Sequence, residues 1–361
     1  MAGIRSTLVD HQGHDYDAVL VVSFGGPEGP DDVMPFLDNV LGDLKIPLPA
    51  RQRIAERYEH FGGVSPINAE TRAFIAALEA ELRAHDIALP VYWGNRNWHP
   101  LLPDTLAKMQ ADGIKRVITH VTSMFSSYSG CRKYREDLYE AAIPLNAAPV
   151  IDKLRLGFNH PGFITAVKDT AYAALADLPA SRQIAAPLLF TAHSLPNSMA
   201  RHTPYEAQLR EACALVADGL GHERWTLAYQ SNNASYGEPW LEPDISEVLR
   251  RLGEHGVRDA VVVPIGFVCD HMEVALDLDV EAQAIAEEAG VNMIRAATVG
   301  THPAYIGMVR ELIGERMTTD AKRRSLGRLG ASHDFCPADC CLSGRPGKAK
   351  LSLCSAAEAG A

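Results

Sequence analysis

The sequence lacks any apolar run long enough to cross a lipid bilayer, which takes about 20 residues. Its opening segment, MAGIRSTLVDHQGHDYD, also lacks the hydrophobic core of a signal peptide. We therefore expect a cytoplasmic protein with no transmembrane segment. Because disulfide bonds are rare in the cytoplasm, the seven cysteines need not pair with one another.

Positive charge is in short supply. The chain has 34 Lys and Arg residues against 45 Asp and Glu residues, a net charge of -11. General affinity for nucleic acid or for an anionic membrane is therefore not expected. An anionic substrate would have to be held by local Arg, Lys and hydroxyl groups.

The glycine-rich turns lack the spacing of a nucleotide-binding motif. The strand-like run Ala18–Phe24 leads into Gly25-Gly26-Pro27-Glu28-Gly29-Pro30. This is neither GxGxxG nor a P-loop, because prolines remove backbone donors and no Lys-Ser/Thr pair follows. The glycines are interpreted as letting the backbone approach a flat ligand, or simply as turning the chain.

Apolar strand-like runs alternate with helical segments along most of the 361 residues. The runs are Ala18–Phe24, Val91–Gly94, Arg116–Val121, Pro187–Phe190, Trp225–Gln230, Asp259–Phe267 and Asn292–Ala296. This alternation predicts an α/β fold of two Rossmann-like, doubly wound domains with parallel sheets and a ligand cleft between them. We place the domains at 17–155 and 156–317, followed by a Cys-rich tail at 318–361.

Two local features are expected within the first domain. Asn68 is a suitable N-cap for a helix over 69–84. The segment Asn39–Ala50, largely apolar with prolines near its end, is expected to form a flexible lip.

An acidic stretch follows the strand that begins near Val261. Glu273, Asp277 and Glu281 are four residues apart, a spacing that stacks them along one stripe of a helix. Carboxylates in such a row repel one another, and a solvated helix face is the usual explanation. Here, however, the stripe begins just after the carboxyl end of a buried strand, where open α/β sheets place ligands. A cation site or a proton path is therefore the favoured interpretation.

His193 lies directly after another buried strand and shares this sheet edge with Glu273. A histidine in such a place is often only a satisfied core residue. Together, though, an imidazole and a carboxylate can ligate a divalent cation, or accept protons near neutral pH.

Cys336, Cys340 and Cys341 form a second constellation near the C-terminus. Thiolate-rich sites favour zinc or an iron–sulfur cluster. Cys131, in an exposed-looking loop, could supply a fourth ligand, while His333 or Cys354 would be the fourth ligand of a zinc ion. The spacing alone leaves zinc, a cluster and a metal-free tail all open.

With these motifs in view, the chain resembles the ferrochelatase family over roughly Asp17 to Arg316. The matching segments are Phe24-Gly25-Gly26-Pro27, Phe61-Gly62-Gly63-Val64-Ser65-Pro66-Ile67-Asn68, Thr191-Ala192-His193-Ser194-Leu195-Pro196, Gln230-Ser231, Pro239-Trp240-Leu241 and Asp270-His271-Met272-Glu273. HSLP together with DHxE is the specific part of this resemblance.

The resemblance implies an enzyme that inserts Fe(II) into a porphyrin in a cleft between two Rossmann-like domains. It implies that His193 binds the metal or takes the pyrrole protons, with Glu273 as its partner across the cleft. Asp277 and Glu281 would continue an acidic path for hydrated iron or outgoing protons. A cation nearby would also stabilise this row of carboxylates.

The porphyrin propionates need donors, and most of the candidates come from the resemblance. They are Arg57, Tyr58, Ser65 and Tyr128, with Arg96 near a strand end as a further basic candidate. Phe24 stands where some relatives carry a tyrosine that can ligate iron, and phenylalanine cannot do so.

The tail Phe335-Cys336-Pro337-Ala338-Asp339-Cys340-Cys341 further resembles the actinobacterial branch of the family. That branch implies a [2Fe–2S] cluster held by Cys131, Cys336, Cys340 and Cys341, and coproporphyrin III as the substrate that becomes coprohaem. The lip Leu41-Gly42-Asp43-Leu44-Lys45 lacks the arginines of firmicute relatives and would also suit protoporphyrin IX.

Two other functions stay open. They are a cobalt chelatase acting on a sirohydrochlorin-type ring, and a non-catalytic iron–sulfur sensor or haem carrier. The oligomeric state is also open, with a monomer favoured.

Overall fold

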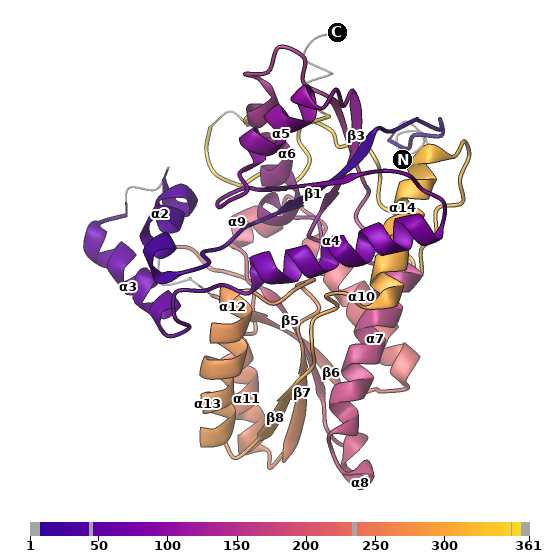
Figure 1. Ribbon diagram of the computed structural model, residues 1–361. Helices are drawn as coiled ribbons and strands as arrows, with labels where there is room; N and C mark the ends of the chain where they lie inside the picture. Colours follow the sequence, from indigo (N-terminus) through magenta and orange to yellow (C-terminus); the bar gives the residue numbers. More distant parts are fainter. Residues whose placement is uncertain (1–7, 43–45, 233–236, 348, 355–361) are drawn as a thin grey trace.

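Two parallel β-sheets form the centre of the protein (Figure 1). The computed structural model describes residues 8–42, 46–232, 237–347 and 349–354. The first sheet contains β1 (Ala18–Ser23), β2 (Val91–Asn95), β3 (Arg116–Val121) and β4 (Val150–Lys153) in the order β2-β1-β3-β4. The second contains β5 (Leu188–His193), β6 (Trp225–Gln230), β7 (Asp259–Val263) and β8 (Asn292–Arg295) in the order β6-β5-β7-β8. All of these pairings are parallel, which confirms the predicted α/β fold.

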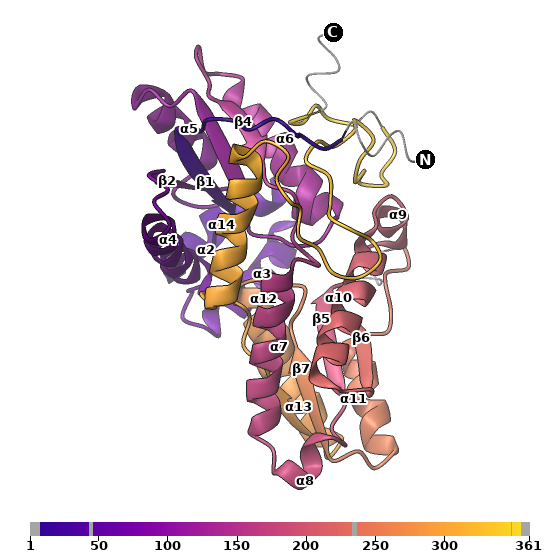
Figure 2. The same ribbon diagram turned by 90° about the vertical axis from the view of Figure 1, so that its right-hand side faces the viewer.

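Helices flank both sheets (Figures 1 and 2). In the first half they are α2 (Pro30–Leu41), α3 (Leu48–Glu59), α4 (Ile67–Ala84), α5 (Leu102–Ala111), the π-helical turn η1 (Tyr128–Arg132) and α6 (Lys133–Ala142). In the second half they are α7 (Pro161–Ala176), α8 (Ala180–Gln183), α9 (Asn197–Ala200), α10 (Tyr205–Leu220), α11 (Ile245–Glu254), α12 (Met272–Val274), the π-helical η3 (Ala275–Ala282), α13 (Gln283–Glu288) and α14 (Pro303–Met317). Among the described residues, no helix is both long and apolar enough to cross a membrane.

One buried core joins the two halves. Val21 of β1, Phe163 of α7 and Phe190 of β5 belong to the same apolar cluster. Helix α14 packs against both α4 and α7, so it connects the helices around the first sheet with those around the second. Because the core is continuous, the spacing between the two sheet edges is fixed by packing. The domain boundaries at 155 and 317 stay a prediction.

Several predicted elements differ from the structure for identifiable reasons. β4 was missed because it is a short edge strand with the sequence VIDK, and its Val150 is 54% exposed. β7 ends at Val263 rather than at residue 267, because Pro264 has no N–H to continue the ladder. Of the lip predicted at 39–50, residues 39–41 belong to the end of α2 and residues 48–50 to the start of α3, while residues 43–45 lie outside the described part of the chain.

The predicted helix cap at Asn68 is also wrong. Helix α4 already begins at Ile67, and its N-cap is Pro66. The buried Asn68 side-chain amide donates instead to the carbonyl oxygens of Gly26 (3.2 Å) and His99 (3.3 Å). Through these two hydrogen bonds, the Asn68 side chain links the first glycine turn to the loop after β2.

The C-terminal tail runs back along the molecule beside α6 and α9 (Figure 2). Leu326 N–H donates to the carbonyl of Asn159, and Leu353 N–H donates to the carbonyl of Arg135. Gly344 has a positive φ of 72° and lies against the Ser198 carbonyl, where a Cβ would be 2.5 Å from that oxygen. Only glycine fits there, so the tail passes in close contact with α9.

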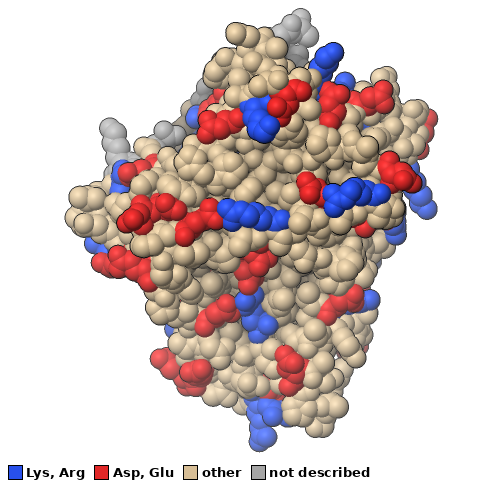
Figure 3. Space-filling view, viewed as in Figure 1, with Lys and Arg blue, Asp and Glu red and all other residues tan. Residues whose placement is uncertain are grey.

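The surface in the view of Figure 1 carries charges of both signs. Lys and Arg are interspersed with Asp and Glu over this face, and neither sign forms a continuous stripe (Figure 3). Elsewhere, ion pairs are local, as between Arg72 and Glu28 at 2.7 Å, both of which are exposed. Such exposed pairs contribute little to stability in water.

Candidate active site and cysteine cluster

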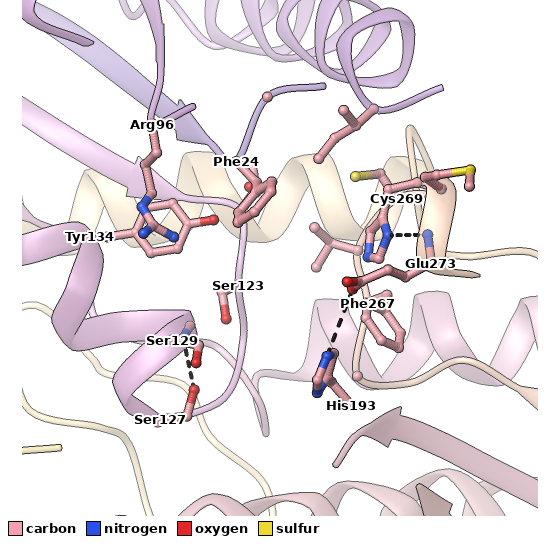
Figure 4. A pocket seen from close by; sticks show the side chains of 18 of the residues that line it. Phe24, Arg96, Ser123, Ser127, Ser129, Tyr134, His193, Phe267, Cys269 and Glu273 are labelled. Atoms are coloured by element: carbon pink, nitrogen blue, oxygen red, sulfur yellow. Dashed lines mark hydrogen bonds and ion pairs between the residues drawn. The ribbon is translucent and has the colours of Figure 1, made fainter. Parts of the chain in front are cut away.

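A cavity of about 340 Å³ opens where the carboxyl ends of the two sheets face each other (Figure 4). Its lining comes from the segments that follow β1, β2, β3, β5 and β7. Ligands of open α/β sheets bind at this edge of the strands. The volume lies within the range of cavities that hold small organic ligands.

His193 and Glu273 face each other inside this cavity (Figure 4). The distance between His193 Nε2 and Glu273 Oε2 is 3.8 Å. On the other side of the ring, His193 Nδ1 is in hydrogen-bond contact with the carbonyl of Ser194, which only accepts, so Nδ1 carries the proton. In the neutral ring, the lone pair of Nε2 then faces the Glu273 carboxylate. Two acceptors facing each other provide a place for a proton or a cation between them.

Glu273 owes its position to the start of a short helix. His271 is the N-cap of α12, and its Nδ1 accepts the backbone N–H of Glu273 at 3.2 Å. Burial lowers the pKa of His271, so the ring stays neutral and can accept this bond. Asp270, just before it, is held by Arg295 at 2.9 Å. The DHxE motif thus fixes the turn that presents the carboxylate.

The acidic stripe continues along a π-helix rather than the α-helix that the spacing predicted. The π-helical segment η3 covers Ala275–Ala282, and such segments occur frequently at functional sites. Asp277 accepts hydrogen bonds from Ser231 Oγ and, at 3.3 Å, from Gln230 Nε2. Glu273 lines the cavity, whereas Asp277 and Glu281 lie outside its lining. The three carboxylates therefore lead from the cavity along η3.

The pKa of Asp277 is raised from 3.8 to about 6, first by burial and then by the charges of Glu273 and Glu281. The folded protein therefore binds more protons than the unfolded chain between these two values, and its stability falls as the pH rises through that window. Asp277→Asn mimics the protonated acid. We expect it to raise the melting temperature above about pH 6, by roughly 1 °C for each kcal/mol gained in a chain of this length, and to change little below the window.

Thermal unfolding followed over this pH range measures the gain for Asp277→Asn. Asp177→Asn, an exposed change at the end of α7, is the matched control and should give a flat difference. A constant effect of Asp277→Asn at every pH would contradict the expectation.

The structure brings four of the six predicted porphyrin-binding residues to the cavity: Phe24, Tyr58, Ser65 and Arg96. Arg57 and Tyr128 are not among its lining residues. Arg57 is exposed on α3, and the Tyr128 hydroxyl donates to Glu136 at 3.1 Å.

Arg96 is the basic side chain in the cavity wall. Its Nε donates to Asp137 at 2.6 Å, and its guanidinium lies 4.6 Å from the centre of the Tyr134 ring and 5.5 Å from that of Phe24. These contacts hold the cation in place.

Several lining residues were not singled out from the sequence. They include Ser123, Ser127, Ser129, Tyr134, Tyr205 and Phe267. The serines follow the carboxyl end of β3, and that position was the available signal. No sequence motif marks Tyr205, yet its hydroxyl donates to the backbone carbonyl of His193 at 3.0 Å and supports the carboxyl end of β5.

The cysteines of the tail gather around Cys131. Cys340 Sγ lies 3.6 Å from Cys341 Sγ and 3.9 Å from His333 Nε2, and ligand atoms of His333, Cys336 and Cys340 lie within 4.8 Å of one another. A hydrogen bond with Cys131 lowers the pKa of Cys336, which places these two side chains in contact. Hydrogen bonding to Cys336 and then Cys340 raises the pKa of His333 to about 10.

Cys131 was expected in an exposed loop, but it lies in the π-helical turn η1 and is 3% exposed. The next residue, Arg132, anchors the tail. Its guanidinium donates to the carbonyls of Ala338 (2.7 Å), Cys340 (2.9 Å) and Lys350 (3.0 Å). One turn therefore supplies both a thiol and the clamp that holds the other thiols beside it.

Comparisons with known proteins agree with this geometry. Residues 16–317 match the family model described as Ferrochelatase. A Rhodopirellula baltica protein named Ferrochelatase is 50% identical over 329 residues, which cover 91% of this chain and 93% of that protein. Proteins named Coproporphyrin III ferrochelatase from Streptomyces griseus and Frankia alni are 46% and 48% identical, covering 92% and 95% of this chain and 94% and 92% of their own lengths.

Solved structures show the same fold at much lower identity. The sirohydrochlorin chelatase SirB from Bacillus subtilis subspecies spizizenii, in complex with cobalt, gives a TM-score of 0.51 at 14% identity, covering 84% of this chain and 96% of that one. This likeness concerns the fold alone. The family model and the sequence relatives, joined to the facing His193 and Glu273, show that the chain belongs to the ferrochelatase family of metal-inserting enzymes.

Proposed function

We propose that the protein inserts Fe(II) into coproporphyrin III to give coprohaem, in haem biosynthesis. The observation that carries this proposal is the lone pair of His193 Nε2 facing the Glu273 carboxylate, 3.8 Å away, in a cavity between the two sheets. Relatives named Coproporphyrin III ferrochelatase align over most of the chain and support the choice of ring.

The chemistry needs a base and a cation-binding group at one place. Two pyrrole N–H protons leave the ring as one Fe²⁺ enters, and the ion loses its water. In the proposed mechanism His193 Nε2 either accepts the two pyrrole protons in turn and passes the first to its partner Glu273, or ligates the incoming ion together with Glu273. Asp277 and Glu281 continue the acidic path along η3, by which hydrated iron arrives or protons depart. Because Asp277 has a pKa of about 6, it can exchange a proton near neutral pH.

The propionates of the ring are proposed to meet Arg96 and the hydroxyls of Tyr58 and Ser65. Arg96 offers charge at a fixed place, because Asp137, Tyr134 and Phe24 restrain it. Arg57 and Tyr128 lie outside the lining and are proposed to act only at the rim. Phe24 supplies an apolar surface for the macrocycle.

Steady-state turnover under anaerobic conditions tests the choice of ring. We expect kcat/KM with Fe(II) to be at least about tenfold higher for coproporphyrin III than for protoporphyrin IX, a difference of about 1.4 kcal/mol in transition-state binding. The reason is that two additional carboxylates can meet Arg96 and the serine hydroxyls of the cavity. Equal or reversed rates would favour protoporphyrin IX. Faster Co(II) insertion into a sirohydrochlorin-type ring would favour the cobalt chelatase, and a single turnover with tightly retained product would favour a carrier.

We also propose a [2Fe–2S] cluster held by Cys131, Cys336, Cys340 and Cys341. The donor set fits, because all four side chains offer sulfur and are drawn together by Arg132. Arg135 Nε, a buried donor with no partner among the described residues, also fits an acceptor beside it. When bound, such a cluster supplies a one-electron redox centre. The compact group of His333, Cys336 and Cys340 supports zinc as the alternative.

The seven cysteines are all free in the structure, which supports a cytoplasmic location for this activity.

A further inference from the structure

We propose that Arg135 and Lys153 are the buried counter-cations of the iron–sulfur cluster, that Arg135 donates an N–H to one of its sulfurs, and that the two charges raise its reduction potential. This inference rests on the cluster proposed above. It assigns a role to two basic side chains that lie away from the cavity and take no part in iron insertion.

Arg135 lies beneath the tail on α6, one helical turn after Cys131. Its side chain is fully buried. Nη1 donates to the Leu353 carbonyl at 3.0 Å and to Ser352 Oγ at 3.3 Å, and Nη2 donates to the Cys340 carbonyl at 3.3 Å. Those bonds hold the guanidinium against the cysteine-bearing segment and leave Nε as a buried N–H without a partner among the described residues.

A buried N–H without an acceptor is costly and needs an explanation. All of the acceptors bonded to the guanidinium belong to the tail that carries the thiols. The thiols nearby, Cys336 first, also raise the pKa of Arg135 against the opposing effect of burial. A thiolate or sulfide of the cluster is therefore the acceptor best placed for Nε.

Lys153, the last residue of β4, is a second buried cation. The residue is 5% exposed, and its Nζ donates to the carbonyl of Leu154 at 2.7 Å. Within the described part of the chain, no carboxylate pairs with this ammonium. Burial would lower the pKa of Lys153, but the sulfurs of Cys131, Cys336 and Cys354 raise it instead. A buried cation needs a compensating anion, and we assign that role to the cluster.

The ion pairs near the cysteines show which buried cations have a carboxylate partner. Arg132 is paired with Glu136 at 2.9 Å, so this couple is neutral. Arg135 and Lys153 have no such carboxylate. A cluster with four thiolates is a dianion when both irons are ferric, and gains a third negative charge when one electron reduces one iron. Zinc with one imidazole and three thiolates is only a monoanion, so two uncompensated cations match the cluster better.

The electrostatic consequence concerns reduction. Adding an electron increases the negative charge of the cluster, and nearby cations and N–H···S hydrogen bonds favour the state with more negative charge. Because both side chains are buried, water screens their effect little. Removing either cation therefore makes the cluster harder to reduce.

A reductive titration with dithionite as electron donor, followed by the EPR signal of the reduced cluster in the full-length holoprotein, measures this effect. Lys153→Met keeps the length of the side chain and removes its charge. We expect at least a tenfold fall in the equilibrium constant for one-electron reduction, which is about 59 mV. Lys350→Met removes the same charge from a side chain that is 53% exposed in the same tail, and should leave the potential unchanged.

Arg135→Lys keeps the charge but removes the Nε donor. We expect a lower potential here as well, with an altered EPR line shape, because one hydrogen bond to sulfur is lost. If Lys153→Met and Arg135→Lys both have the same reduction potential as Lys350→Met and the wild type, the inference is overturned, whereas the proposal of a cluster is unaffected. If the wild-type protein carries zinc and gives no EPR signal after reduction, the cluster itself is wrong and the inference falls with it.

Discussion

Replacement of His193 by alanine is expected to lower kcat/KM for iron insertion by roughly 100- to 10,000-fold, the usual contribution of a positioned acid–base group. The reason is geometric. Nδ1 is engaged by the Ser194 carbonyl, so Nε2 is the free lone pair that faces Glu273 at 3.8 Å. Anaerobic turnover with Fe(II) and coproporphyrin III measures the loss, and quenching of porphyrin fluorescence measures binding of the ring, which should change little.

Two further variants sharpen this test. Glu273→Gln keeps the size of the side chain and removes its charge, so it should also lower turnover strongly. His202→Ala removes an exposed imidazole just after α9 and should behave like the wild type. Wild-type turnover in both His193→Ala and Glu273→Gln would end the assignment of these roles. A loss of ring binding equal to the loss of turnover would make His193 a porphyrin contact instead.

Replacement of Cys336 by serine is expected to remove the cluster and to destabilise the protein by roughly 4 kcal/mol or more, the range in which loss of a metal centre falls. Cys336 is 4% exposed and is the cysteine whose pKa is lowered by Cys131, so its thiolate joins the tail to η1. Analysis of iron, acid-labile sulfide and zinc, together with the visible spectrum and thermal unfolding, measures both effects.

Cys213→Ser is the matched control for this second prediction. Cys213 is also fully buried, but it lies in α10 and packs in the main apolar core. The control protein should remain brown with full iron content even if its stability falls. A wild-type protein that is colourless and contains zinc would reverse the choice of metal. Full iron content in Cys336→Ser would instead assign the ligand position to another residue such as Cys354.

Seven of the eight strands could be predicted because they are largely apolar runs between turn residues. Val261, Val262 and Val263 of β7 are almost wholly buried, and so are Val19 and Val21 of β1. β4 shows the limit of this signal. An edge strand has a neighbour on one side only, so its residues need not be apolar, and VIDK resembles a loop.

The site could be predicted as far as chain position determines it. His193 is the last residue of β5, which is longer than predicted, and Glu273 lies after β7; parallel strands bring these ends to one edge. The direction of a side chain, in contrast, does not follow from its position in the chain. Tyr128 follows β3 just as the lining serines do, yet its hydroxyl reaches Glu136 and not the cavity. That choice depends on the turn η1, for which a sequence of five residues carries no periodic signal.

The long-range contacts of the tail could not be predicted from the sequence, for another reason. Arg132 and Arg135 bond backbone carbonyls more than 200 positions later in the chain, such as Leu353 for Arg135. Carbonyls exist at every residue, so no residue type marks these partners in advance. From the sequence, both arginines resemble ordinary charges on an amphipathic helix.

The clamp formed by Arg132 has a consequence for shortened forms of the protein. Its guanidinium is 1% exposed, and its acceptors Ala338, Cys340 and Lys350 all come from the last few dozen positions. Cutting the chain before them would remove three hydrogen-bond acceptors of a buried guanidinium and leave Glu136 as its remaining partner, close to the serines that line the cavity. We therefore expect the C-terminal extension to fold as one unit with the rest of the chain, and a protein shortened before residue 338 to be less stable than the full chain.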